Sequence, residues 1–268
     1  MSPDAAAILC LIALASATVG AVVIQARRSA DCWQTWALHV IARCYSPLMF
    51  RQRLGPRCTL PSEGGALLIG NHRSPVDPLL IFSGSCRRRD GYRLRVIEFL
   101  TASEYCRIGG FIGWVCKHTH SIPVDRDGRD REPAKEALRR LQRGHLVGIF
   151  PEGRINTGAG LLPANPGVAW LALKGGQPVI PVFIHGAPQS GNMVKPFVTS
   201  SRVRVTWGDP IDLSEHRNER FTPELLNRVT SLLMERLAAT GALWDAGETE
   251  PTILQSPAIR LSTESMSA

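Results

Sequence analysis

His72 and Asp77 are two side chains whose types and spacing could form a catalytic base and its partner. Both follow the apolar run 66–70, which predicts a buried strand, so they would emerge together at the end of that strand. A carboxylate that binds one ring nitrogen of a histidine keeps the other nitrogen in the form that takes a proton from a hydroxyl group. The pair therefore suggests general base chemistry on a hydroxyl group.

The same spacing occurs a second time, between His120 and Asp125. The intervening residues 121–124 predict a strand, and an extended backbone would hold these two side chains too far apart to touch. We therefore favour His72 and Asp77 as the functional pair.

Asp77 also has a structural interpretation. Ser74, Pro75 and Asp77 fit the N-cap, N1 and N3 positions of a helix that begins here. Pro78 disfavours helical backbone angles at Asp77 and so weakens this assignment. Because a carboxylate has two oxygen atoms, Asp77 could both cap a helix and orient His72.

Two more polar turns follow predicted strands. Glu152, Gly153 and Arg154 form one of them, in which the glycine would let the backbone approach a ligand closely. The same turn is equally compatible with a simple ion pair. Arg126 lies in the other turn, where it could bind a phosphate group through two hydrogen bonds or be an ordinary surface arginine.

The elements that must position these turns alternate between strand and helix. This alternation predicts one α/β domain, residues 58–244, with a largely parallel sheet flanked by helices. Parallel strands place their carboxyl ends at one edge, where α/β proteins bind ligands, so we expect the polar turns to meet there. The predicted strands are 66–69, 94–99, 121–124, 146–150, 179–184 and 203–207, and the predicted helices are 77–83, 104–116, 133–143, 167–173 and 222–240, the last ending at Gly241.

Residues 1–28 predict a membrane anchor. The stretch 5–25 has no charged side chain, and a helix of about 20 apolar residues crosses the hydrocarbon core of a bilayer. Arg27 and Arg28 follow this stretch, whereas a cleaved signal peptide normally has its basic residues before the apolar part. We predict a retained helix and, from the positive-inside tendency, a catalytic domain on the cytoplasmic side of the inner membrane.

Two further segments flank the domain. Residues 29–57 contain apolar side chains at helical spacing between polar ones. They could form an amphipathic helix in the membrane interface or an ordinary core helix, and both alternatives remain open. Residues 245–268 are rich in Ser, Thr, Glu and Pro and predict a disordered tail.

The composition narrows the classes of partner. The 268 residues carry a net charge of +8, which suits an anionic membrane, a phosphorylated substrate or nucleic acid, or is simply a solvated basic surface. We find no nucleic-acid-binding motif, and a membrane helix argues against that partner. The seven cysteines include no Cys-x-x-Cys pair, so we predict neither a metal site nor a disulfide framework, and free thiols suit a reducing compartment.

Taken together, four blocks resemble the glycerolipid acyltransferase family, over about residues 65–210. The order and the intervals of the blocks fit, which makes the combination far more specific than any block alone. The blocks are Asn71–Asp77, Ile122–Arg126, Phe150–Arg154 and Val179–Val182.

The resemblance implies roles for individual side chains. His72 would be the general base and Asp77 its partner, while Arg126 and the Glu152–Gly153 turn would bind a phosphate-bearing acceptor. All the positions that we assign to substrate binding lie in the four blocks: Asn71, Arg126, Glu152, Gly153, Arg154 and Pro181. The third block departs from the common form, because Arg154 follows Gly153 without an intervening Thr. This form is similar to a branch that acylates lysophosphatidylethanolamine.

The implied reaction is acyl transfer from acyl-CoA or acyl-carrier protein to the free hydroxyl of a lysophospholipid, foremost 1-acylglycerol 3-phosphate, which gives phosphatidate. It requires no cofactor, metal or covalent enzyme intermediate. Membrane lipids, the lysophospholipid and the acyl thioester would be the partners. Two alternatives remain: another lysolipid acceptor such as lysophosphatidylethanolamine, and a non-catalytic protein that binds lipid at the membrane surface.

Overall fold

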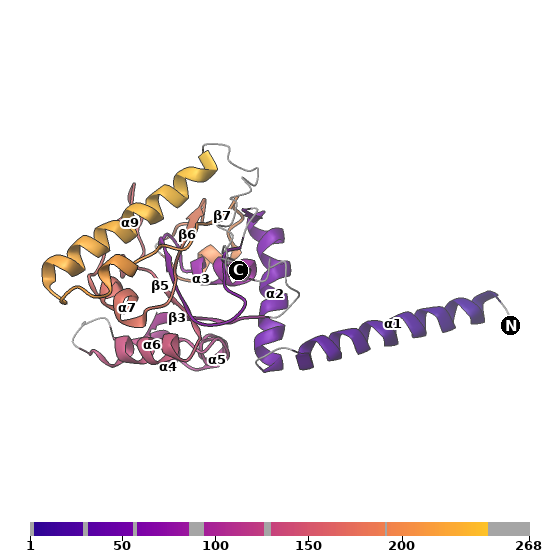
Figure 1. Cartoon of the computed structure of the whole chain (residues 1–268). Coiled ribbons are helices and arrows are strands. Elements are labelled where there is room, and N and C mark those ends of the chain that lie inside the picture. Colours follow the sequence, from indigo (N-terminus) through magenta and orange to yellow (C-terminus); the bar gives the residue numbers. More distant parts are fainter. Residues whose placement is uncertain are drawn as a thin grey trace, which may run out of the picture.

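The computed structural model describes residues 3–28, 32–55, 58–85, 94–125, 130–190 and 192–245. A long N-terminal helix projects from a domain built around one sheet (Figure 1). Within the described residues this sheet has seven strands in the order β1-β7-β6-β2-β5-β3-β4. The strands are β1 Arg53–Leu54, β2 Ala66–Gly70, β3 Ile97–Ala102, β4 Ile122–Val124, β5 Leu146–Ile149, β6 Val179–His185 and β7 Arg204–Trp207.

The sheet is largely parallel, as the alternation of strands and helices predicted. Strands β4, β3, β5, β2 and β6 pair in parallel from one neighbour to the next, and β1 pairs in parallel with β7. The pair of β6 and β7 is antiparallel. The carboxyl ends of five neighbouring strands therefore lie along one edge, which is where the polar turns follow.

Helices cover both faces of the sheet. One hydrophobic core joins the sheet to α6, α7 and α9, and a second core joins it to α2 and α3. Alternate side chains of β2 serve the two cores, Leu67 and Ile69 on one face and Leu68 on the other. The helices are α1 Pro3–Arg28, α2 Trp33–Phe50, α3 Asp77–Gly84, α4 Ser103–Arg107, α5 Gly110–His118, α6 Glu132–Gln142, α7 Gly167–Gly175, α8 Lys195–Val198 and α9 Pro223–Asp245, with a 3₁₀ helix at Ser214–His216.

Most predicted elements are present, and the exceptions have physical reasons. Helix α9 continues through Gly241, so the predicted stop there is wrong. A Cβ atom at this position would lie 2.9 Å from the ring of Phe183, so the glycine serves close packing and not helix termination. Strand β3 begins at Ile97, three residues later than predicted. The short elements β1 and α8 have too few residues to show a period in the sequence.

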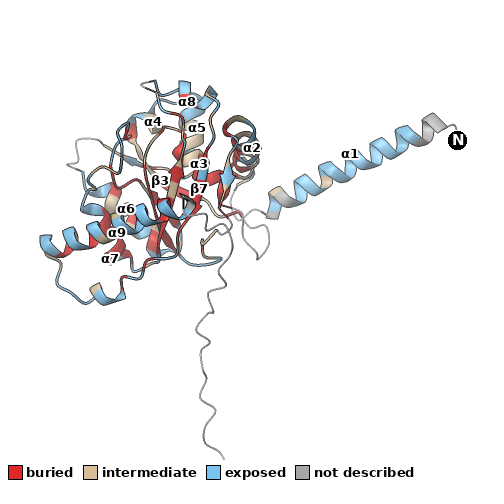
Figure 2. Cartoon of the chain, turned by 90° about the horizontal axis from the view of Figure 1, so that it is seen from above, coloured by how far each residue is buried: buried red, intermediate tan, exposed pale blue. Residues whose placement is uncertain are grey.

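The flanking segments are described in part. Helix α1 contains an apolar stretch, Ala7–Ile24, that is long enough to cross a membrane, and none of it is buried (Figure 2). This exposure of apolar side chains indicates membrane association. Helix α2 packs one side on α3 and the second core. Residues 246–268, nearly all of the predicted tail, lie outside the described part of the chain.

Candidate active site

The predicted pair of His72 and Asp77 is in contact at the carboxyl end of β2. Nδ1 of His72 lies 2.9 Å from Oδ2 of Asp77. The side chain of His72 is 18% exposed and that of Asp77 is fully buried. Because Nδ1 is engaged by the carboxylate, Nε2 is the ring nitrogen left for a substrate proton.

Asp77 is held by the turn that carries His72. Its Oδ2 also accepts hydrogen bonds from the backbone N–H groups of Arg73 and Ser74, at 2.6 and 2.7 Å. Complete burial raises the pKa of the Asp77 carboxyl above its ordinary value, and the hydrogen bonds from His72 and the turn offset only part of that shift. These three donors fix the carboxylate and thereby the plane of the imidazole.

The capping interpretation of this turn is wrong in detail. Helix α3 begins at Asp77 after Val76, and the hydroxyl of Ser74 donates to the carbonyl of Pro188 instead of capping the helix. The backbone N–H of Ser74 does donate to the Asp77 carboxylate, so this side chain serves the turn and His72 at once. The same oxygen, Oδ2, binds His72 and the turn, whereas the sequence suggested that Asp77 would use one oxygen for His72 and the other for the helix cap.

Phe150 supports the ring of His72 from the next strand. The two rings are stacked with their centroids 4.2 Å apart, and the ring of Phe99 also stacks with Phe150, at 5.5 Å. Gly70 leaves room for this arrangement, because a Cβ atom there would lie 3.1 Å from the Phe150 ring. The imidazole is thus fixed by its carboxylate partner and by packing on one ring face.

Glu152 contacts the backbone of His72. Its Oε1 accepts the N–H of His72 at 2.9 Å, while its Oε2 accepts the side-chain amide of Asn156 and the N–H of Leu162, at 2.8 and 2.9 Å. The backbone N–H of Asn156 in turn donates to the carbonyl of His72 at 2.7 Å. Both oxygens of Glu152 therefore accept hydrogen bonds inside the protein, and the residue is only 7% exposed.

Gly153 and Arg154 form the exposed tip of the same turn. Gly153 has a φ of +68°, a left-handed conformation that favours glycine, and its N–H closes the turn on the carbonyl of Phe150. Arg154 is exposed beside it. No hydrogen bond or ion pair joins its guanidinium group to another described residue, so the simple ion pair with Glu152 is absent there.

Asn71 and Pro181 lie close to this edge, but their side chains contact other parts of the sheet and its connections. The side-chain amide of Asn71 is buried and bonds the N–H and the carbonyl of Ile184 at 2.7 and 2.9 Å. Pro181 pairs with Ile69 inside the sheet and its ring packs beside Gly208. We infer supporting roles for both.

The second His-x4-Asp sequence forms no comparable pair among the described contacts. Strand β4 separates the two residues, and Asp125 instead accepts a hydrogen bond from Ser103 and lies 3.7 Å from the guanidinium of Arg107. Arg126, which the sequence assigns to phosphate binding, lies outside the described residues.

Three residues that build this site were not among the candidates predicted from the sequence. Asn156 closes the loop after Glu152 around His72, and Phe150 stacks on the imidazole. Arg73 donates from its guanidinium to the carbonyls of Asn156 and Gly158. All three lie inside or directly after a recognised block, and that adjacency was the available signal.

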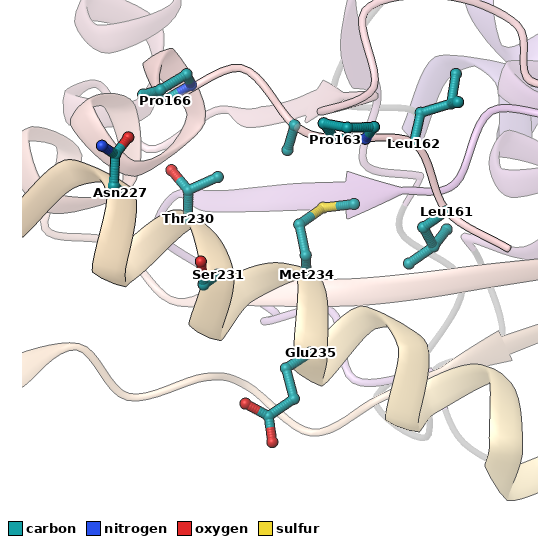
Figure 3. Close-up of a pocket in the computed structure, with 10 residues that line it drawn as sticks. Leu161, Leu162, Pro163, Pro166, Asn227, Thr230, Ser231, Met234 and Glu235 are labelled. Carbon is teal, nitrogen blue, oxygen red and sulfur yellow. The ribbon is translucent and has the colours of Figure 1, made fainter.

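A cavity of about 620 Å³ lies between the segment after Gly160 and helix α9 (Figure 3). Leu161 and Leu162 line one wall and Met234 lines the other, with polar side chains of α9 at the rim. The backbone N–H of Leu162 donates a hydrogen bond to Oε2 of Glu152. The carboxylate of Glu152 therefore links this wall of the cavity to the backbone of His72 through hydrogen bonds.

The fold and the site define an α/β protein with a histidine–carboxylate pair at the carboxyl edge of its sheet. A family model described as Acyltransferase matches residues 55–185. A 1-acyl-sn-glycerol-3-phosphate acyltransferase of Haemophilus influenzae is 31% identical over 184 residues, 62% of this chain and 73% of the relative. One from Bacillus subtilis is 25% identical over 178 residues, 66% of this chain and 82% of the relative.

The fold also matches a solved structure. The 1-acyl-sn-glycerophosphate acyltransferase of Thermotoga maritima superposes with a TM-score of 0.60 at 19% identity, over 85% of this chain and 88% of that one. The chain belongs to the acyltransferase family.

Proposed function

We propose that this chain transfers an acyl group from an acyl thioester to the free hydroxyl of 1-acylglycerol 3-phosphate and so forms phosphatidate. The observation that carries the proposal is the contact between Nδ1 of His72 and the buried Asp77, which leaves Nε2 for the acceptor. The names of the bacterial relatives supply the substrate class.

The proposed step needs one base and no covalent enzyme intermediate. Nε2 of His72 takes the proton of the acceptor hydroxyl as its oxygen attacks the thioester carbonyl carbon. The C–S bond then breaks, and the thiolate takes the proton back from the imidazolium. The products are the acylated lipid and a free thiol, and His72 returns to its neutral form. Asp77 holds the ring tautomer throughout and stabilises the transient imidazolium.

The acceptor headgroup would be recognised by the exposed cations at this edge. Arg154 lies at the tip of the turn after β5, beside the strand that carries His72, and its guanidinium can bind a phosphate through paired hydrogen bonds. Glu152 is committed to His72 and Asn156, so we assign it to positioning. Arg126 remains a proposed second phosphate ligand.

Helix α1 would anchor the enzyme where its lipid substrates reside. We propose that Ala7–Ile24 spans the bilayer and that Arg27 keeps the following domain on the cytoplasmic side. The donor would be acyl-CoA or acyl-carrier protein, both of which present a thioester from the aqueous phase.

The proposal is tested with the full-length protein in phospholipid vesicles. Acyl-CoA, or acyl-carrier protein in a parallel series, is supplied with 1-acylglycerol 3-phosphate or with lysophosphatidylethanolamine. Free thiol and diacyl lipid are measured together. We expect equal amounts of the two products and the highest rate with 1-acylglycerol 3-phosphate.

Each other outcome identifies a different function. A higher rate with lysophosphatidylethanolamine would keep the reaction and replace the acceptor, in line with the Glu-Gly-Arg-Ile form of the third block. Thiol release without acylated lipid would indicate a thioesterase. No turnover with any pair, together with lipid binding, would indicate the non-catalytic alternative.

A further inference from the structure

Cys32 and His118 form a second pair of reactive side chains, on other elements than His72. Sγ of Cys32, directly before α2, lies 3.5 Å from Nδ1 of His118, the last residue of α5. A thiol within hydrogen-bond reach of an imidazole is the arrangement that makes a sulfur nucleophile, because the ring can take the thiol proton. The two residues are 86 positions apart, so the fold brings them together.

Thr35 holds the end of α5 beside the thiol. Its hydroxyl donates a hydrogen bond to the carbonyl of His118 at 2.6 Å, and its Oγ1 lies 3.1 Å from Sγ of Cys32. The side chain of Thr35 is fully buried where the start of α2 meets α5 (Figure 1). The ring of Trp114 packs against that of His118, with the centroids 4.8 Å apart. The histidine is therefore held at its backbone and at its ring.

The start of α2 adds favourable charge beside the sulfur. Cys32 occupies the N-cap position of this 18-residue helix, and its carbonyl accepts the backbone N–H of Trp36. The first N–H groups of a helix have no partner within the helix and carry partial positive charge. They stabilise negative charge on a sulfur at the N-cap and on an oxygen bound next to it. A carbonyl group attacked by Cys32 would develop such an oxyanion.

The pair is accessible, and the surface beside it is apolar. Cys32 and His118 are both half-buried. Trp33, the next residue after the thiol, is 63% exposed. The rings of Trp114 and Phe111 stack with their centroids 6.1 Å apart, and these residues are 37% and 73% exposed. Exposed aromatic rings offer a binding surface to an apolar chain. A long-chain acyl thioester presents both such a chain and an electrophilic carbonyl carbon.

We propose that Cys32 is a site of S-acylation, at which the thiol takes a long-chain acyl group directly from an acyl thioester with His118 as the base. The site lies outside the pair of His72 and Asp77. The inference goes beyond the proposed function, with which it shares only the acyl donor. Cys32 follows α1 closely, since that helix ends at Arg28, and cysteines next to a membrane helix are typical positions of reversible S-acylation.

The step is an exchange of one thioester for another. Nδ1 of His118 takes the proton of the Cys32 thiol as the sulfur attacks the carbonyl carbon of the donor. The C–S bond to the donor then breaks, and the leaving thiolate takes the proton from the imidazolium. The products are an S-acylated cysteine and a free thiol, so nothing is oxidised or reduced and no further reactant is needed.

The site is tested by mass spectrometry and by hydroxylamine, which cleaves thioesters. Full-length protein in vesicles is incubated with palmitoyl-CoA and no lysolipid. We expect the mass of a single acyl group to be added, to map to Cys32 and to be lost with hydroxylamine. Cys32→Ser should remove this addition. Cys44→Ser is the matched control, because Cys44 is an exposed thiol of the same helix, and this variant should be acylated like the wild type.

His118→Gln tests the base. Glutamine keeps a polar side chain at the end of α5 but does not take the thiol proton, so the rate of S-acylation should fall by at least ~10²-fold. In His118→Ala, added imidazole should restore part of the rate, which a purely structural role of His118 would not allow. An unchanged rate in His118→Gln would overturn the assignment of the base. An unmodified wild type, or acylation of another cysteine in place of Cys32, would overturn the site.

The outcomes separate this site from the proposed function. His72→Ala should be acylated at Cys32 as fast as the wild type, because the base at this site is a different histidine. Loss of S-acylation in His72→Ala would contradict direct transfer to Cys32. If the wild type forms no phosphatidate but is acylated at Cys32, the proposed function fails and the S-acylation site stands.

Discussion

Glu152 accepts a hydrogen bond from the backbone N–H of His72 at 2.9 Å, although 80 residues separate the two in the chain. The same carboxylate accepts the side-chain amide of Asn156, whose own N–H returns to the carbonyl of His72. Both backbone groups of His72 are thus held by one loop. The Glu-Gly turn of the third block therefore holds the backbone of the proposed base in place, and we call this arrangement the clamp.

Glu152→Gln tests this clamp. One amide oxygen can still accept the N–H of His72, but the amide nitrogen would face the donors of Asn156 and Leu162. We expect the free energy of unfolding to fall by about 1–3 kcal/mol and kcat to fall, with little change in the KM for the lysolipid. A rise in that KM at constant kcat would instead assign Glu152 to acceptor binding.

A double-mutant cycle tests whether Glu152 and Asn156 act together. Because their side chains share a hydrogen bond, Glu152→Gln and Asn156→Ala should be non-additive, with a coupling of about 0.5–3 kcal/mol in kcat/KM. Rates of the single and double variants in vesicles provide the measurement. Additive losses would show that the two residues act independently.

Asp77→Asn tests the orientation of the base. The amide is almost the same size as the carboxylate but does not hold Nδ1–H of His72 as an anion does, so kcat should fall by ~10²- to 10⁴-fold. Circular dichroism should show the wild-type fold. A variant that keeps the wild-type kcat would reduce Asp77 to a structural residue of the turn.

Arg154→Ala tests recognition of the headgroup. Arg154 is exposed, so the substitution should leave the melting temperature unchanged. Loss of a charge-assisted hydrogen bond worth about 1.5–3 kcal/mol would raise the KM for 1-acylglycerol 3-phosphate roughly 10- to 100-fold. Arg236→Ala, an exposed arginine of α9, is the control. Equal KM values for the two variants would remove Arg154 from the acceptor site.

His39 makes the stability of the domain depend on pH. Burial, with help from the nearby charge of Arg43, lowers the pKa of His39 from 6.5 to about 4. Between these values the unfolded chain is protonated at this residue and the folded chain is not. The free energy of unfolding therefore falls as the pH drops from 6.5 towards 4, by up to about 3 kcal/mol.

His39→Leu should remove that dependence. Thermal unfolding in detergent at about pH 7 and about pH 4.5 compares the two chains, and the wild type should lose more stability on acidification than the variant. The raised pKa of Asp77 also changes the free energy of unfolding in acid. Asp77 is present in both chains, so its effect cancels in the comparison. Identical losses would show that His39 does not carry the effect.

The sequence predicted the contact that matters most, because His72 and Asp77 lie on one local turn after a strand with a clear apolar pattern. It also predicted the parallel sheet and therefore the edge at which the turns meet. It did not predict the direction in which side chains point. Asn71 and Pro181 were assigned to the substrate, yet the amide of Asn71 bonds β6 and the ring of Pro181 packs beside Gly208.

The contacts of Glu152 could not be predicted for a related reason. They depend on β5 lying directly beside β2, a pairing between distant segments that no local pattern encodes. The apolar stripe of α2 is visible in the sequence, but only the structure separates its exposed side from its buried one. Helix α2 packs on the domain with one side and exposes apolar residues on the other, so the choice between a core and an interfacial helix stays a prediction.

His72 is the proposed base of an acyl transfer to a lysolipid. The most direct measurement is the initial rate of phosphatidate formation from acyl-CoA and 1-acylglycerol 3-phosphate by full-length His72→Ala in vesicles. His216→Ala is the matched control, because His216 also pairs with a carboxylate. Its Nδ1 lies 2.7 Å from Oε1 of Glu219, and both residues are far from β2 in the sequence. We predict a loss of ~10²- to 10⁴-fold for His72→Ala and the wild-type rate for His216→Ala. Equal rates for His72→Ala and the wild type would contradict the account.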